Sequence, residues 1–174
     1  MGVESIYGQS QKIKLLVGTL AKPSNLYIAL LSKIQNAGVG SAVDPTSTEA
    51  LIATVASSSS NLTEDGDTGG GAVDANYVRT AISLGDANWT YTAGSAGNPA
   101  KATNTNAISI TVPTGGLTSI VGWALCWSST IGAVDNLAAG AFSSAQQGSY
   151  LAGETIQIAA NALSITEQDS TVAN

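Results

Sequence analysis

The segment Ile120–Ser128 has the sequence IVGWALCWS, and it indicates the fold more clearly than any other part of the chain. Its large apolar residues, Trp123, Leu125 and Trp127, alternate with small ones. A period of two is the spacing of a β-strand, in which successive side chains point to opposite faces. We therefore expect a buried strand here, with both tryptophans in the protein core.

Similar short segments lie on both sides of this one, separated by Gly, Asn and Pro residues that are typical of turns. The predicted strands are Asn25–Ser32, Tyr77–Leu84, Trp89–Thr92, Ala107–Val112, Leu137–Ser143, Glu154–Ile158 and Leu163–Thr166. The apolar positions are even at Ile156 and Ile158 but odd at Leu163 and Ile165, which predicts a bulge or a strand corner between them. The whole pattern predicts an all-β protein, a jelly-roll-like β-sandwich.

One short helix is expected before the strands. Apolar residues recur at helical spacing within Gln9–Leu20, and Pro23 is expected to end the helix. We divide the chain into an N-terminal helix or arm, residues 1–22, and a β-sandwich domain, residues 23–174. Residues 35–75 are rich in Gly, Ser and Asp, and we expect them to form a long loop.

The composition restricts the possible functions. Only 10% of the 174 residues are charged, and Ala, Gly, Ser and Thr together make up 85 residues. Such a surface can be buried against another protein with little desolvation of charge. The chain has no His, which excludes Ser-His-Asp and Cys-His catalytic systems and His-ligated metals. The net charge of −6 and the short apolar runs lead us to expect no nucleic acid and no membrane as partners.

The positive charges are concentrated near the N-terminus. Residues 1–33 contain four lysines and one acid, whereas the rest of the chain contains two basic residues and eleven acids. Two interpretations remain open. In the first, the lysines simply lie on the solvent-exposed outer face of a helix. In the other, Lys12, Lys14 and Lys22 dock onto an acidic protein surface.

The acidic part of the long loop is a second candidate contact surface. Asp65–Gly70 resembles the start of a calcium-binding loop, but Asn76 stands where such a loop has its bidentate Glu. We therefore expect no metal site, and leave open a calcium site completed by a neighbouring subunit. Asp65, Asp67 and Arg79 are interpreted as contacts with a partner subunit.

We expect no catalytic residues and no cofactor. Glycoside hydrolysis by two carboxylates needs no His, but the twelve acids show no paired pattern, and no Gly-rich phosphate-binding motif occurs. Trp89 and Tyr91 lie on one face of a short polar strand. They form the alternative site, an aromatic platform for a glycan.

Five stretches, taken in their order along the chain, carry a resemblance to a known family. They are Lys12–Ser32, Thr63–Leu84, Ser109–Ser128, Asn136–Phe142 and Gly153–Glu167. In order and spacing they resemble small virion proteins of tailed bacteriophages, which are described as capsid decoration (cement) proteins or as tail-fibre-like proteins. Family members often have Gly-Tyr-Ala-Arg where this chain has Asn76-Tyr77-Val78-Arg79.

The resemblance implies a β-rich structural protein without catalytic residues. We expect a decoration protein that binds the outer surface of the major capsid protein lattice as a homo-oligomer, a trimer, and stabilises the head. It would be made in the cytoplasm of the bacterial host and would reside on the capsid exterior of the virion. The alternative is a tail or fibre module that binds host surface glycans. A third hypothesis, an esterase or glycosidase that uses carboxylates and hydroxyls, belongs to a different class.

Overall fold

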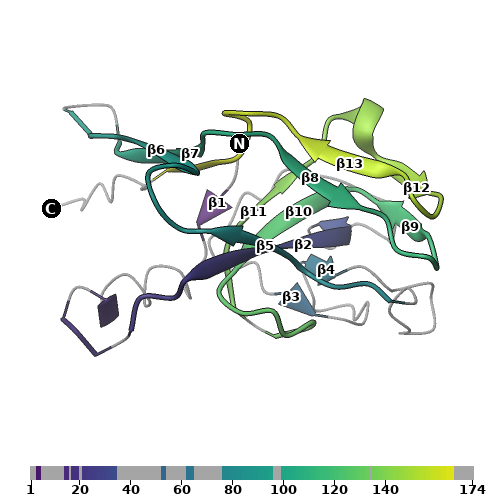
Figure 1. Cartoon of the computed structure of the whole chain (residues 1–174), viewed down its shortest axis with the longest axis horizontal. Coiled ribbons are helices and arrows are strands. Elements are labelled where there is room, and N and C mark those ends of the chain that lie inside the picture. Colours follow the sequence, from purple (N-terminus) through teal and green to yellow (C-terminus); the bar gives the residue numbers. More distant parts are fainter. Residues whose placement is uncertain are drawn as a thin grey trace, which may run out of the picture.

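A computed structural model gives the structure of the chain. It describes residues 3–4, 14–15, 17–19, 21–34, 52–53, 62–64, 76–95, 99–133 and 135–166. These residues form mostly β-strands in several antiparallel sheets, with almost no helix (Figure 1). The predicted all-β class is therefore confirmed, and the finer jelly-roll topology stays a prediction.

Seven strands form the largest sheet. Six of them follow one another in space as β1 (Val3–Glu4), β11 (Asn136–Ala141), β10 (Gly122–Cys126), β2 (Asn25–Ile34), β4 (Leu62–Glu64) and β3 (Ile52–Ala53). The seventh, β5 (Thr80–Ser83), pairs with the first four residues of β2, and β4 pairs with the last four. A strand has two edges for pairing, and β10 occupies one edge of β2 along residues 27–31. β4 and β5 therefore lie along the other edge of β2.

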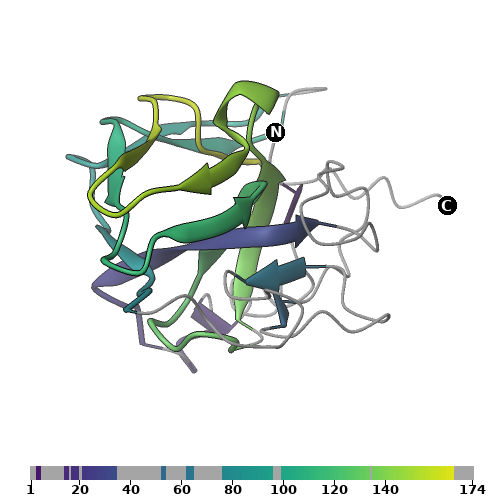
Figure 2. The same ribbon diagram turned by 90° about the vertical axis from the view of Figure 1, so that its right-hand side faces the viewer.

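Three smaller sheets cover one side of this sheet (Figure 2). They consist of β9 (Leu117–Ile120) with β12 (Gly148–Tyr150), β8 (Ile108–Thr111) with β13 (Thr155–Ile158), and β6 (Trp89–Thr92) with β7 (Lys101–Asn104) and β14 (Ser164–Thr166). A single 3-10 turn, η1 (Ser144–Gln146), precedes β12 among the described residues.

Apolar side chains of the large and small sheets meet in one buried core. From the large sheet it contains Leu26, Ile28, Leu30, Trp123, Leu125 and Ala138, and from the small sheets and their turns Ile110, Val112, Leu117, Ile120, Ile156, Ile158 and Leu163. The opposite face of the large sheet is also buried, and its cluster contains Ala29, Leu31, Ile34, Leu62, Val121, Ala124, Cys126 and Ala139. Burial on both faces explains why β2 is apolar at successive positions rather than alternating.

The alternation in Ile120–Ser128 predicted how β10 divides between these two clusters. Trp123 and Leu125 lie in the first cluster, as expected, whereas Trp127 is only partly buried against it. The small residues of β10 face the second cluster, where strands approach closely. A Cβ added at Gly122 would lie 2.4 Å from the carbonyl oxygen of Gly140 in β11. A side chain at Gly122 therefore has no room.

Each predicted strand segment contains a strand, although most observed strands are shorter. The expected phase change after Ile158 is a strand corner. The amide of Ala162 donates to the carbonyl of Ala159 at 3.1 Å, and the strands on either side, β13 and β14, belong to different sheets. That prediction is confirmed.

Two sequence predictions are corrected here. Leu62–Glu64 lies inside the predicted loop at 35–75 but forms β4, a fully buried strand. The helix, of which Lys14 and Leu15 are described, ends at Gly18 and not at Pro23. Gly18 has a φ of 71°. Its amide donates to the Leu15 carbonyl at 3.1 Å, and the next amide donates to the Lys14 carbonyl at 2.9 Å, the bonds with which glycine ends a helix.

Residues 9–13, 16 and 20 of the predicted helix lie outside the described residues. β1 falls within the predicted arm of residues 1–22, and its backbone pairs with β11 at the edge of the large sheet. Val3 and Glu4 are thereby tied to the large sheet. The division at residue 22 stays a prediction.

Candidate functional site

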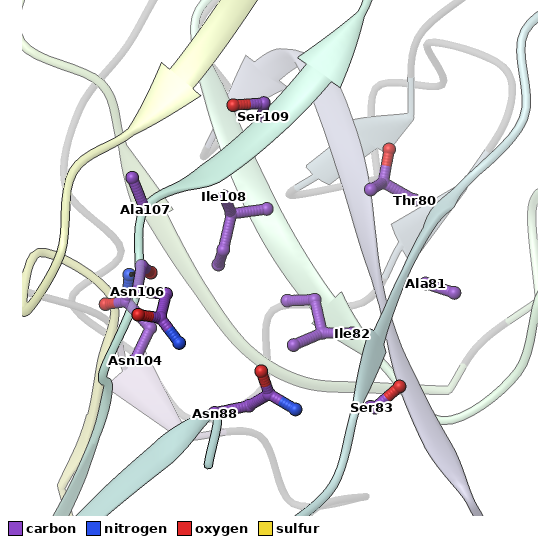
Figure 3. A pocket seen from close by; sticks show the side chains of 10 residues that line it. All are labelled: Thr80, Ala81, Ile82, Ser83, Asn88, Asn104, Asn106, Ala107, Ile108 and Ser109. Carbon is purple, nitrogen blue, oxygen red and sulfur yellow. Dashed lines mark hydrogen bonds between the residues drawn. The ribbon is translucent and has the colours of Figure 1, made fainter.

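A groove of about 280 Å³ separates β5 from β8 (Figure 3). Ten residues without charged side chains line it: Thr80, Ala81, Ile82, Ser83, Asn88, Asn104, Asn106, Ala107, Ile108 and Ser109. The lining includes all four residues of β5, the first two residues of β8, and Ala107 directly before β8. Because side chains alternate along a strand, consecutive residues line a groove only where the edge of the strand faces it.

The edge of β5 presents unpaired main-chain groups. The Leu84 amide donates to the Ser24 carbonyl at 3.0 Å. Because hydrogen-bonded and non-hydrogen-bonded pairs alternate along antiparallel strands, the even-numbered residues of β5 are the ones whose main chain bonds to β2. The main-chain groups of Ala81 and Ser83 therefore point away from β2. In the described part of the chain, no hydrogen bond reaches these groups. β5 is thus open on its second side.

The edge of β8 is open in the same way. The Val112 amide donates to the Glu154 carbonyl at 2.9 Å, so that even-numbered residues of β8 bond to β13. The main-chain groups of Ser109 consequently point away from β13. The groove therefore has an open strand edge on each side.

Apolar side chains form the inner part of the groove. Ile82 and Ile108 extend into it from its two sides (Figure 3). Both belong to or pack against the main core. A ligand that enters the groove would therefore contact apolar surface at its base and polar main chain at its sides.

Three asparagines gather at one end of the groove (Figure 3). Asn104 is buried, and its amide nitrogen donates to the carbonyls of Asn106 (2.7 Å) and Ala159 (2.8 Å). The amide nitrogen of Asn106 donates to the Ala87 carbonyl at 3.0 Å. The side chain of Asn88 has no hydrogen bond to any described residue, so its amide can bind a ligand.

The start of β5 is fixed by a buried ion network around Arg79. Its Nε and Nη2 donate to the two carboxylate oxygens of Glu64, and Nη1 donates to Oδ1 of Asp135, all at 2.8 Å. The guanidinium also donates to the carbonyls of Ser128 (2.9 Å) and Ala133 (3.4 Å). These five bonds match the five N–H donors of a guanidinium. The paired geometry toward Glu64 is the strong, two-pronged form.

Glu64 joins the network to the rest of the large sheet. Its carboxylate is fully buried and also accepts hydrogen bonds from the Gly132 amide at 2.6 Å and the Tyr77 hydroxyl at 3.2 Å. The Tyr77 hydroxyl accepts from the amide of Leu30 at 2.9 Å, at the point of β2 between its β5 and β4 pairings. The network thus connects β2, β4, β5 and the segment before β11.

The charge of Arg79 is strongly held. Desolvation lowers the pKa of Arg79, but its hydrogen bond to Glu64, together with smaller contributions from Cys126 and Asp135, raises the pKa above its ordinary range. The guanidinium is therefore positively charged wherever the protein is folded.

Arg79 was predicted to contact a partner subunit, and that prediction is wrong. Its side chain is buried and its donors are all occupied within the chain. Of the other predicted contact residues, Lys14 and Lys22 are exposed. Lys12, Asp65 and Asp67 lie outside the described residues, and their roles stay predictions.

The two residues of the predicted aromatic platform differ in exposure, and their glycan-binding role stays a prediction. Tyr91 is 71% exposed, whereas Trp89 is partly buried against the main core, and its indole nitrogen is inaccessible to solvent. Tyr91 is therefore the more accessible of the two rings.

Burial raises the pKa of the Cys126 thiol well above its ordinary value. The charge of Arg79 opposes this rise, and the charges of Asp135 and Glu64 add to it. The thiol is therefore protonated in the folded protein at pH values where an unfolded chain already releases its proton.

This difference predicts a pH dependence of stability. An unfolded cysteine has a pKa of about 8.5, so above that pH the folded state holds more protons than the unfolded state. We expect the Cys126 contribution to lower the free energy of unfolding by about 1.4 kcal/mol for each pH unit above about 8.5. Urea unfolding of the wild type and Cys126→Ala between pH 7 and pH 10 measures it. The variant should have a shallower decline, and equal declines would contradict the prediction.

Nothing in the described part of the chain groups three or more His, Cys, Asp or Glu side chains for a metal ion. No described helix has the length and apolarity needed to cross a membrane. No family model matches the chain, and neither does any curated protein sequence. The groove and its two open edges are therefore the main guide to function.

Proposed function

We propose that this protein is a structural component of a tailed-bacteriophage virion. In this proposal it is a decoration protein with a jelly-roll-like β-sandwich, which binds the outer surface of the major capsid protein lattice and stabilises the head. It acts without catalysis or cofactor, as a trimer, after synthesis in the bacterial host cytoplasm. The resemblance of five sequence stretches to such virion proteins motivates the identity of the partner.

The observation that supports a binding role best is the neutral groove with two open strand edges. The polar groups of the groove that bond to no described residue are main-chain amides and carbonyls, the side-chain amide of Asn88, and the hydroxyls of Thr80, Ser83 and Ser109. Groups of this kind recognise another polypeptide, because a strand added to a sheet edge bonds through its main chain. Titratable side chains are absent from the groove lining, so the groove offers no proton donor or base of its own.

The proposed mechanism is thermodynamic. A protein that binds only the assembled shell adds its binding free energy to the stability of that shell. Many copies on a repeating lattice strengthen one another's attachment through avidity. A surface with few charges favours this role because little charge is desolvated on contact.

The test is co-sedimentation with capsids that lack decoration. We expect the wild type to pellet with capsids and to raise their resistance to heat, and we expect Lys14→Glu/Lys22→Glu to pellet less. Lys101→Glu is the matched control, since Lys101 is exposed but lies in β7 rather than near the N-terminus. Failure of the wild type to bind would overturn the proposal. Equal binding by the Lys14/Lys22 variant would remove only the basic contact surface.

The exposed ring of Tyr91 favours one alternative, a tail or fibre module that binds host glycans through stacking. That function requires Tyr91→Ala to abolish attachment to host cells while capsid binding is absent from the start. The decoration function predicts that neither the wild type nor Tyr91→Ala attaches to host cells.

A further inference from the structure

We propose that the groove between β5 and β8 receives strand β6 of a second copy of this chain, so that the copies join head to tail into a closed ring. The inference deepens the proposed function, because it names the contact that builds the oligomer. It stands on three observations: an open acceptor edge, an open donor edge, and matching neutral chemistry.

The acceptor is the groove edge of β5. The main-chain groups of Ala81 and Ser83 point into open space and bond to no described residue. Unpaired strand edges are sites at which another strand adds. β8 lines the other side and Asn88 one end, so an added strand would be held laterally as well.

The donor is the outer edge of β6. The Thr105 amide donates to the Asn88 carbonyl at 2.9 Å. The hydrogen-bonded pairs between β6 and β7 therefore fall at every second residue from Asn88 onward. Thr90 and Thr92 therefore bond to β7, and the main-chain groups of Tyr91 point outward. β6 is the last strand of its sheet, so no described strand covers that edge.

The chemistry of the two edges matches. β6 reads WTYT and carries no charge, and the groove lining carries none either. Tyr91 is 71% exposed, so its ring is accessible to a partner that pairs with β6. An uncharged strand enters a neutral groove without leaving a desolvated charge behind.

The acceptor edge and the donor edge lie on different parts of one chain, so each contact joins two different surfaces. A contact between two different surfaces is heterologous, and it generates a ring when the rotation closes. A trimer formed in this way is compatible with the proposed decoration of a capsid. The ring needs Tyr91 of one copy beside Ala81 or Ser83 of the next.

Disulfide trapping tests this juxtaposition. Residues opposite each other on paired antiparallel strands have Cα atoms about 4.5–5.5 Å apart, within the range of a disulfide. We expect Ala81→Cys/Tyr91→Cys or Ser83→Cys/Tyr91→Cys to form intermolecular disulfides that give covalent trimers on oxidation. Ala81→Cys/Leu151→Cys is the matched control, since Leu151 is exposed to a similar extent as Tyr91 but lies outside the groove and β6. The native Cys126 is buried and does not compete.

A second measurement separates pairing from mere proximity. Ala81→Pro removes the outward amide of β5, and Ala81→Ser keeps it. We expect the proline variant to weaken self-association about tenfold in sedimentation equilibrium, the equivalent of about one lost hydrogen bond, and the serine variant to match the wild type. Circular dichroism and urea unfolding check that the proline variant is folded. If it is not, disulfide trapping alone decides the proposal.

Three outcomes would overturn the inference. One is a wild type that is monomeric in solution. Another is trapping that is no more efficient at the groove than at Leu151. The third is trapping of Ala81→Cys to a cysteine-bearing capsid protein in place of a second copy. A monomeric protein that still decorates capsids would overturn the ring and leave the proposed function intact.

Discussion

Replacing Arg79 with alanine should lower the free energy of unfolding by about 3–5 kcal/mol, the range seen when one partner of a buried ion pair is removed. Glu64 is fully buried and Asp135 nearly so, and Arg79 is the cation that both carboxylates contact. Without it, two negative charges would remain in a region that excludes water. The start of β5 would lose its attachment at the same time, so the groove edge would lose order.

Urea unfolding followed by tryptophan fluorescence measures this effect. Lys22→Ala is the matched control, because Lys22 is exposed and such surface changes shift stability by no more than about 0.5 kcal/mol. Arg79→Lys should also destabilise, since an ammonium retains the charge but cannot make five directed bonds. A loss below about 1 kcal/mol in Arg79→Ala would contradict the structural role of the network.

Replacing Trp123 with alanine should lower the free energy of unfolding by about 3–5 kcal/mol through the cavity that it leaves. Trp123 is 6% exposed and lies in the main core on β10, the central strand between β2 and β11. Its indole occupies space left by Gly140 on β11, where an added Cβ would lie 2.8 Å from Cζ2 of the ring. The strand pair is therefore built around this side chain.

Trp127→Ala is the matched control for this prediction. Trp127 belongs to the same set of alternating large residues as Trp123 but is only partly buried. Its truncation therefore removes less buried apolar surface. Urea unfolding at neutral pH should give a clearly smaller loss for Trp127→Ala than for Trp123→Ala. Equal losses would contradict the position of Trp123 at the centre of the core.

Strands with an apolar alternation could be predicted from the sequence, and strands without one could not. The period of two in Ile120–Ser128 indicated both β10 and its division between two clusters. β7, Lys101–Asn104, has no large apolar residue and is held by pairing with β6 and β14, so its own residues do not predict it. β4 is only three residues long and lies among loop-forming residues.

The same limit applies to the candidate site. Arg79 and Glu64 are 15 positions apart, and Arg79 and Asp135 are 56 apart. Such distances along the chain leave no local pattern, and a lone arginine is ordinarily exposed. The open edges of β5 and β8 depend on which strands pair, and this is a property of the topology. The positions of Asn88 and Asn106 in the groove could not be predicted either. Asparagine in a turn is common in any β protein, and only the fold places these two residues beside the groove.

The most direct test of the central claim is a count of this protein in purified phage particles. Particles from the host that carries this gene would be banded on a density gradient, washed in high salt and analysed by quantitative mass spectrometry against the major capsid protein. The account predicts a fixed ratio of the two proteins across independent preparations, with the protein on heads and not on isolated tails. Its absence from washed particles, or a location on tails alone, would contradict the account.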